Sequence, residues 1–255
     1  ISAPVSELVA LIQEAKALKH PNFAGLHLEG PFISHDYKGA HDPKVLHAPT
    51  DAELAQIVEA SDGLVKSMTV APELISDSQL QSLQEAGIGV CFGHSAAGYE
   101  QARAFFTKGS KIMTHAFNGM AGIHHRAPGP VPAALESDTF TELIADGVHV
   151  EPAAARLLNQ KKVILVTDAM AATGMPDGDY SLGTMPVKVT KGVARTESGS
   201  IAGSTLLLKD AVRNYAEWTG SPVSALRAAI TNPAIAYGMD APTLSRGSKS
   251  WLLWN

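Results

Sequence analysis

Short apolar runs alternate with longer amphipathic segments along most of the chain. The apolar runs are typical of strands and cover residues 25–30, 65–73, 87–95, 111–118, 139–150 and 161–170. Apolar residues recur at helical spacing over 4–18, 49–60, 77–87, 97–109, 151–161, 205–218 and 222–230. This alternation predicts six strand–helix units and therefore an α/β fold built on a parallel sheet.

Polar side chains stand at the carboxyl ends of the predicted strands, namely Glu29, His94, His115, His149 and Asp168. A (β/α)8 TIM barrel collects its functional residues at this end of its strands, whereas an open doubly wound sheet binds ligands only at its switch point. Polar groups at nearly every strand end therefore favour a TIM-barrel-like fold, of which this sequence supplies about six of the eight strands.

The remaining segments indicate where the barrel is interrupted or incomplete. Residues 183–203 have the pattern of a β insertion after the sixth strand. Residues 1–245 form the expected barrel domain, and 246–255, which end in WLLWN, look like the start of a strand belonging to a separate small β domain. Because a closed barrel has eight strands, two further strand–helix units are expected to precede Ile1.

Composition and charge argue against several classes of function. The chain has 255 residues, 45% of them hydrophobic, and a formal net charge of −5. Nucleic acid is not an expected partner, because binding phosphates needs clustered Lys and Arg that the sequence lacks. No apolar run is long enough to predict a membrane span. The single cysteine, Cys91, cannot form an internal disulfide, which fits a reducing, cytoplasmic setting.

Glu29, His94 and His115 are the first candidates for chemistry. Each has an ordinary alternative: Glu29 a salt bridge, and each histidine a hydrogen-bonded core position. A buried carboxylate must nevertheless be paired, protonated or bound to a metal. Two imidazoles and a carboxylate at successive strand ends suit zinc or a similar divalent ion, with a position left open for water.

Two further strand ends carry candidate side chains. Asp168 follows the most apolar strand and would act as a general acid/base beside such a metal, or alternatively as the N-cap of a helix. His149, in ADGVHV, is equally consistent with a plain surface loop.

Several loop residues suit an anionic ligand. Arg126 lies in HHRAPGP, and Asn118 with Gly119 offers an amide side chain and a backbone N–H shortly after His115. The segment 202–207 has the pattern of a helix N-terminus, which would bind an anion or simply be capped by Ser204. The residues alone thus predict a metal-dependent hydrolase with an anionic substrate, and they do not identify that substrate.

Seven motifs in order give a more specific indication: LHLEGPF, GHSAAGYEQA, THAFNGM, HHRAPG, ADGVHV, LVTDAM and IAGSTL. In this order they resemble the N-acetylglucosamine-6-phosphate deacetylase family of the amidohydrolase superfamily. The resemblance implies hydrolysis of N-acetyl-D-glucosamine 6-phosphate to D-glucosamine 6-phosphate and acetate. It also implies a homodimer, and a longer chain in which the missing barrel strands accompany a small β-sandwich.

The resemblance also implies a role for individual residues. Glu29, His94 and His115 would hold a divalent metal, Zn²⁺ in the first place or Fe²⁺, and Asp168 with His41 would be catalytic. The substrate would be bound by Ala40, His41, Asn118, Gly119, Arg126, His149, Ile201, Ala202 and Gly203. Arg126 would reach the site of the neighbouring subunit.

Three alternatives stay open at this level. The substrate could be another N-acetylamino-sugar phosphate, such as the galactosamine isomer, or a cyclic amide. Many cyclic-amide hydrolases use a carboxylated lysine to bridge two metals, and Glu29 at that place argues against them. The chain could also bind a sugar phosphate without turnover. Whether one metal ion or two are bound is not decided by these residues.

Overall fold

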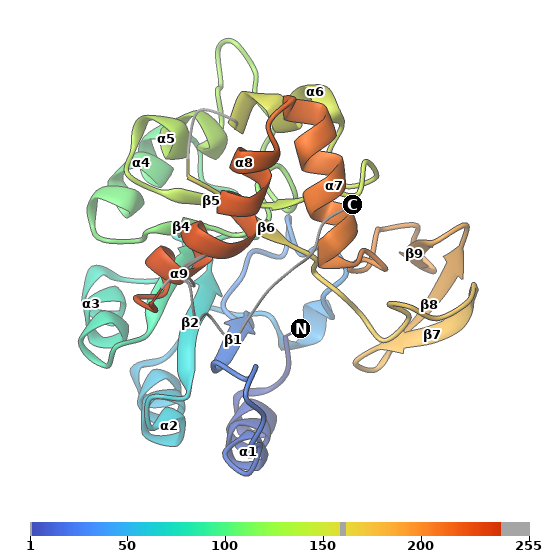
Figure 1. Cartoon of the computed structure of the whole chain (residues 1–255). Coiled ribbons are helices and arrows are strands. Elements are labelled where there is room, and N and C mark those ends of the chain that lie inside the picture. Colours follow the sequence, from blue (N-terminus) through green and yellow to red (C-terminus); the bar gives the residue numbers. More distant parts are fainter. Residues whose placement is uncertain (1, 159–161, 241–255) are drawn as a thin grey trace.

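The computed structural model describes residues 2–158 and 162–240 of the chain. Six parallel strands follow one another in sequence order across a curled sheet, with helices around its outer face (Figure 1). The strands are β1 Leu26–Glu29, β2 Val65–Val70, β3 Gly89–Phe92, β4 Ile112–Met113, β5 Phe140–Ile144 and β6 Val163–Val166. The predicted TIM-barrel-like α/β fold with six strands is confirmed.

The helices form where the sequence places an apolar stripe. They are α1 Val5–Ala15, α2 Asp51–Ser61, α3 Asp77–Glu85, α4 Tyr99–Thr107, α5 Pro130–Glu136, α6 Pro152–Ala155, α7 Leu208–Thr219, α8 Pro222–Leu226 and α9 Asn232–Ala236. Helices α2, α3 and α8 also begin at a residue whose side chain caps the helix. Thr50 and Ser76 start α2 and α3 with capping boxes, each completed by the side chain three residues later. Such caps satisfy backbone N–H groups that the first helical turn leaves unpaired.

The main apolar core lies between the sheet and the helices. Met68 of β2 and Phe92 of β3 are fully buried there, against helix residues such as Ile57 and Leu83. This layer uses mainly the outward-facing residues of each strand, because alternate side chains of a strand point to opposite faces. Other strand residues form a second, smaller apolar cluster, namely Cys91, Ile112, Phe140 and Ile164.

A small antiparallel sheet follows β6. It overlaps the expected β insertion 183–203 but begins earlier, at Gly178. It consists of β7 Gly178–Leu182, β8 Met185–Thr190 and β9 Val193–Thr196, and it stands beside the barrel in Figure 1. Its own core contains Val187, Val189 and Ala194 and extends to Met170 and Ala202. Through this cluster the insertion is fixed next to the end of β6.

Three local predictions fail or fall outside the described residues. Helix α5 is not expected from the sequence, because Pro130 and the preceding Gly129 look like a loop, although proline is favoured in a first helical turn. Residues 202–207 are not a helix N-terminus, since α7 begins only at Leu208. The segment 246–255, predicted to start a second domain, lies outside the described part of the chain.

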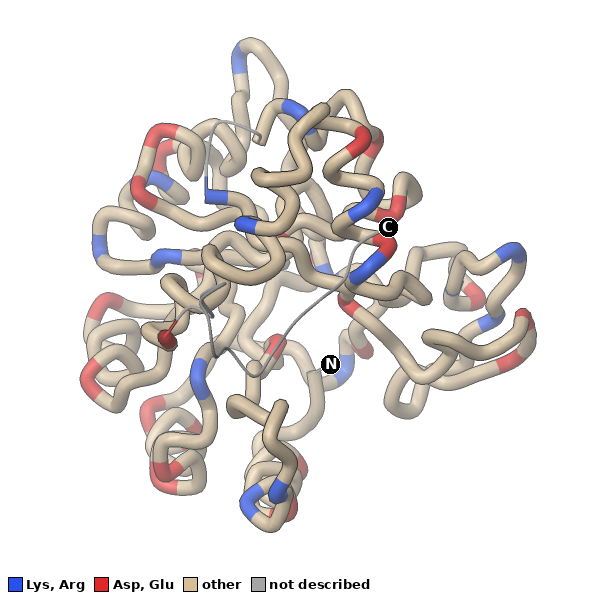
Figure 2. The backbone as a smooth tube through the Cα atoms, in the orientation of Figure 1, with Lys and Arg blue, Asp and Glu red and all other residues tan. Residues whose placement is uncertain are grey.

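Charge is spread over the outside of the molecule. Figure 2 shows acidic and basic residues interspersed on the outer helices. Within residues 2–158 and 162–240, no helix is both long and apolar enough to cross a membrane.

Candidate active site

Three candidate side chains share one position relative to their strands. His94, His115 and Asp168 each stand two residues after the last residue of β3, β4 and β6. All three have positive φ angles, of 45°, 27° and 49°. Such backbone is costly for residues other than glycine and clusters at functional sites. The turn directs each side chain inward over the rim of the sheet, which is the edge formed by the carboxyl ends of its strands, instead of along the next loop.

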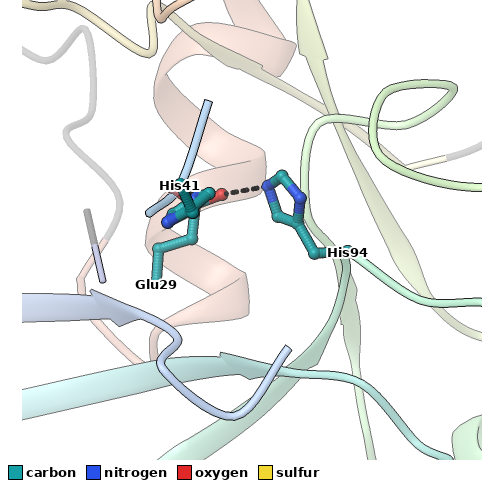
Figure 3. Close-up of side chains that lie close together, drawn as sticks. All are labelled: Glu29, His41 and His94. Carbon is teal, nitrogen blue, oxygen red and sulfur yellow. Dashed lines mark hydrogen bonds and ion pairs between the residues drawn. The ribbon is translucent and has the colours of Figure 1, made fainter. Parts of the chain in front are cut away.

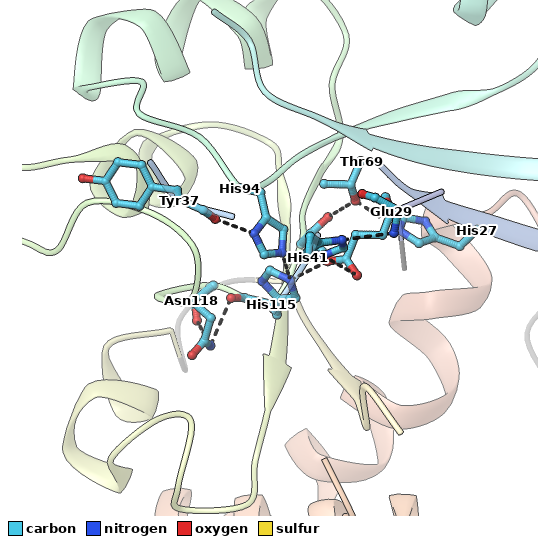
Figure 4. Close-up of polar contacts among 11 residues, drawn as sticks. His27, Glu29, Tyr37, His41, Thr69, His94, His115 and Asn118 are labelled. Carbon is cyan, nitrogen blue, oxygen red and sulfur yellow. Dashed lines mark hydrogen bonds and ion pairs between the residues drawn. The ribbon is translucent and has the colours of Figure 1, made fainter. Parts of the chain in front are cut away.

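Glu29, His94 and His115 meet at the centre of this rim (Figure 4). Glu29 Oε1 lies 3.0 Å from His94 Nε2 and 2.7 Å from His115 Nε2, and the two Nε2 atoms are 3.1 Å apart. Neighbouring ligand atoms around tetrahedral zinc are separated by about 3.3 Å. Three donor atoms from three strand ends thus already converge at separations slightly shorter than those around a bound metal.

The hydrogen bonds of His94 show that these residues fit a cation. Its Nδ1–H donates to the backbone carbonyl of Tyr37 at 2.7 Å, so a neutral His94 has its lone pair on Nε2. That lone pair faces the Glu29 carboxylate without a proton between them. The lone pair and the carboxylate repel each other, and a cation coordinated by both atoms would remove this repulsion. The Tyr37 carbonyl would orient the His94 ring.

The charges at the rim also favour a bound cation. Burial alone would raise the pKa of Glu29, but hydrogen bonds with His115 and His94 hold it well below its usual range. Burial would lower the pKa of His115, but the hydrogen bond and charge of Glu29 raise it to about 9. The ionised Glu29 carboxylate and His115 are therefore stabilised by one positive charge between them. A proton on His115 supplies this charge until a metal ion replaces it.

Gly39 and Gly119 leave room for the His94 ring. A Cβ atom at Gly119, whose φ is 60°, would lie 2.7 Å from His94 Nδ1. A Cβ atom at Gly39 would lie 3.2 Å from His94 Cε1. The ring is thus enclosed between two backbone segments that approach it closely.

His41 is near enough to be taken for a metal ligand. Donor atoms of Glu29, His41 and His94 all lie within 4.8 Å of one another (Figure 3). However, the backbone N–H of Ser2 donates to His41 Nδ1 at 3.1 Å. Burial lowers the pKa of His41 to about 3, so the ring is neutral and carries its single proton on Nε2. In this tautomer His41 Nε2 offers a hydrogen-bond donor and no lone pair for a metal ion.

Asp168 lies beside this cluster at the end of β6. Its backbone carbonyl accepts from the Ser204 N–H at 2.7 Å, and no helix begins directly after it, so the helix N-cap alternative is wrong. Burial, assisted by the charge of Glu29, raises the pKa of Asp168. A carboxyl group with a raised pKa is suited to accept and return a proton near neutral pH.

The candidate residues surround a pocket of about 310 Å³, within the size range of small-ligand sites. Its lining includes Glu29, Ala40, His41, His94, His115, Asn118, Gly119, His149, Asp168, Ile201 and Gly203. Ala202 is instead buried in the core of the β7–β9 sheet. A larger hollow of about 790 Å³ lies over that sheet, but the charged residues in its lining are exposed.

The structure does not bring Arg126 into this pocket. Arg126 is exposed, and its guanidinium contacts the ring of His125 on the same loop. Asn118 lines the pocket, but its side-chain amide donates to the carbonyls of His115 and Ala116, both at 3.2 Å. Its amide nitrogen therefore holds the loop after His115, and its oxygen is the atom left for a ligand.

His149 is held by a neighbour that the sequence did not single out. Its Nδ1 lies 2.6 Å from Asp146 Oδ2, and its side chain is only 7% exposed, so the surface-loop alternative is wrong. Asp146 Oδ1 also accepts from the N–H groups of Val148 and His149, both at 2.8 Å. These bonds lower the pKa of Asp146 against the effect of burial. One sequence feature could have identified Asp146. It stands two residues after the end of β5, the same position that His94, His115 and Asp168 have after their strands.

A family model described as "Amidohydrolase family" matches residues 5–253. The chain belongs to the amidohydrolase family. Amidohydrolase relatives include N-acetylgalactosamine-6-phosphate deacetylase of Escherichia coli O157:H7, which is 43% identical over 222 residues. N-acetylglucosamine-6-phosphate deacetylase of Vibrio furnissii is 39% identical over 233 residues. The matches cover 85% and 88% of this chain but 59% and 58% of the relatives, so the chain spans under two thirds of their length.

Solved amidohydrolase structures agree with the fold. A mutant N-acetyl-D-glucosamine-6-phosphate deacetylase from Mycobacterium smegmatis, in complex with N-acetyl-D-glucosamine 6-phosphate, superposes with a TM-score of 0.91 at 36% identity. That match covers 97% of this chain and 68% of the mycobacterial one. The enzyme from Thermotoga maritima gives a TM-score of 0.86, also at 36% identity, over 93% and 67% of the two chains.

Proposed function

We propose that this chain carries the active site of an N-acetylglucosamine-6-phosphate deacetylase, which hydrolyses N-acetyl-D-glucosamine 6-phosphate to D-glucosamine 6-phosphate and acetate. The supporting observation is one pocket that joins a carboxylate–histidine–histidine donor set, a neutral histidine donor and a carboxyl group of raised pKa. Relatives that act on N-acetylamino-sugar phosphates support the choice of substrate.

Glu29, His94 and His115 would hold one divalent cation. Zinc is the first candidate and Fe²⁺ the alternative, because both accept two imidazoles and a carboxylate. Bound there, the cation would supply Lewis acidity and lower the pKa of water. The donor set of the described residues supports this single site.

His41 and Asp168 would carry the proton chemistry. The His41 Nε2–H would donate to the acetamide carbonyl oxygen and stabilise the negative charge that develops there during attack by water. Asp168 would take the proton of the attacking water as the new C–O bond forms. It would then give the same proton to the departing nitrogen as the C–N bond breaks, so that the amine and acetic acid leave and the Asp168 carboxylate is regenerated. The acid then loses its proton to the amine or to solvent and becomes acetate.

The phosphate end of the substrate would lie toward His149, with Asn118 and Gly119 beside it. Ile201 and Gly203, which also line the pocket, would contact the sugar, and Ala202 between them would act only through its backbone. Arg126 would complete the phosphate site from the neighbouring subunit of a homodimer. Its exposure and its position outside the lining of its own pocket support this placement.

Mixed dimers test the contribution of Arg126. Arg126→Ala alone should raise KM for the phosphorylated substrate and leave the slow reaction with unphosphorylated N-acetylglucosamine nearly unchanged. If Arg126 serves its neighbour, subunits bearing Arg126→Ala and subunits bearing Asp168→Asn should regain activity when mixed. Each hybrid would contain one site with both groups intact. No recovery in proven hybrids would place Arg126 in its own site or remove it from binding.

N-acetylgalactosamine 6-phosphate is a second candidate substrate. The 43% identity to an enzyme named for that sugar favours it. The two sugars differ at one hydroxyl, so initial rates of acetate release should be compared on both phosphates at equal concentration. A higher kcat/KM for the galactosamine isomer would reassign the substrate. Binding of either phosphate with no acetate release, in metal-loaded protein, would instead indicate a non-catalytic binding protein.

A further inference from the structure

Glu73 makes two short hydrogen bonds to the loop that carries His94. Its Oε2 accepts from the Ser95 hydroxyl and its Oε1 from the Ala96 backbone N–H, both at 2.6 Å. Glu73 follows β2, whereas the loop follows β3, so these bonds link the ends of neighbouring strands. Both acceptor atoms of one carboxylate are thus used on the two residues after a candidate metal ligand.

The same loop is held at further points. Ser95 is fully buried, its N–H donates to the Gly119 carbonyl at 3.0 Å, and its hydroxyl accepts from the Ala97 N–H at 2.9 Å. The His94 carbonyl accepts from the Ser34 N–H at 2.8 Å. His94 itself has a φ of 45°, which is unfavourable for a histidine and persists only when surrounding contacts fix the loop. Of these contacts, only Glu73 contributes a charged acceptor, and charge-assisted hydrogen bonds are the stronger kind.

We propose that Glu73 is a positioning residue of the metal centre, which fixes the loop after β3 so that His94 Nε2 is aimed at the cation before the cation binds. The inference rests on the proposed metal site but not on the substrate. Loss of the Glu73 carboxylate would let the loop relax toward ordinary backbone and swing the imidazole away from Glu29. Metal affinity would then fall although every ligand is present.

Glu73→Gln is the sharpest test because it keeps the shape of the side chain. The amide oxygen can still accept from the Ala96 N–H, but the NH₂ group can bond Ser95 only by donating to its hydroxyl oxygen, so the charged acceptor for both donors is lost. Zn²⁺ and Co²⁺ dissociation constants would be measured on the intact protein by competition with a chromophoric chelator. Removing an outer partner of a metal-ligating histidine typically weakens binding about 10- to 100-fold, and we expect a loss in that range.

Glu136→Gln is the matched control. Glu136 is an exposed carboxylate on α5 that accepts from the Tyr99 hydroxyl, so the same substitution removes a comparable charge away from the pocket while the amide oxygen can still accept that one bond. Its metal affinity should equal that of the unsubstituted protein. The absorption spectrum of bound Co²⁺ should change in Glu73→Gln and not in Glu136→Gln, because only the former alters ligand geometry.

The outcomes separate the possible failures. Equal metal affinity in Glu73→Gln and Glu136→Gln would overturn the positioning role, even if Glu73→Gln melts at a lower temperature. Absence of metal binding by the unsubstituted protein would instead contradict the proposed metal site. If Glu73→Gln does not fold, Ser95→Ala removes one of the two bonds. It should weaken metal binding by a smaller factor, and unchanged affinity there would also overturn the proposal.

Discussion

Replacement of Ser2 by proline tests whether His41 is a hydrogen-bond donor or a metal ligand. Two bonds join Ser2 to the site: its N–H donates to His41 Nδ1 at 3.1 Å, and its hydroxyl donates to the Glu29 carbonyl at 3.0 Å. Ser2→Pro removes both, since proline has no N–H, whereas Ser2→Ala removes only the second. The difference between the two variants therefore isolates the backbone donor that places the His41 proton on Nε2.

The expected magnitude follows from that single hydrogen bond. Its net value is about 0.5–1.5 kcal/mol, which corresponds to about a 2- to 13-fold change in tautomer population. Ser2→Pro should lower kcat by up to that factor relative to Ser2→Ala. His41→Ala sets the upper limit, because losing a donor to developing oxyanion charge typically costs about 10²–10³ in kcat.

Acetate release gives the kinetic comparison, and ¹⁵N NMR of His41 gives the tautomer directly. The ring should show a protonated Nε2 in the unsubstituted protein and in Ser2→Ala, with a growing Nδ1–H population in Ser2→Pro. Equal kcat in the two Ser2 variants would refute the reasoning. So would a His41 Nε2 that carries no proton in the metal-loaded enzyme, because His41 would then be a fourth ligand.

Three other perturbations have defined outcomes. Asp168→Asn should lower kcat by about 10²–10⁴ while metal content stays normal, and loss of metal in this variant would make Asp168 a ligand instead. Gly119→Ala should destabilise the protein by about 1–2 kcal/mol in thermal unfolding, because its φ of 60° disfavours any Cβ, and should also weaken metal binding. In metal-free protein, the pKa of His115, raised from 6.5 to about 9, contributes stability that is complete below pH 6.5 and lost as the pH rises through 9. Metal affinity should rise about tenfold per pH unit over that interval, with one proton released, and a flat profile would contradict the assignment of His115.

The sequence predicted the strand ends well because two independent patterns coincide there. Apolar runs set the strands, and a polar residue such as His94 or Asp168 interrupts each run where the chain turns. Parallel strands in sequence order then bring these ends to one rim without further information. The amino-acid sequence alone was therefore enough to group Glu29, His94 and His115, although their roles stay predictions.

Other features depend on contacts that pattern alone does not contain. Glu73 and Asp146 look like ordinary acidic loop residues. Glu73 is distinguished by its bonds to the loop after β3, and Asp146 by its bonds to His149 within its own loop. The segment 202–207 resembled a helix start because of its Gly-Ser-Thr composition, but pairing beside Asp168 holds it extended. The tautomer of His41 depends on a backbone N–H donated by Ser2, a residue 39 positions away in the sequence.

Stepwise return of Zn²⁺ to metal-free protein, followed by acetate release from N-acetyl-D-glucosamine 6-phosphate, tests the central claim most directly. The account predicts no turnover without metal, a rise to a plateau as the site fills, and no recovery in Glu29→Gln at the same Zn²⁺ concentrations. Turnover by metal-free protein, or bound Zn²⁺ with no acetate released from either amino-sugar phosphate, would contradict it.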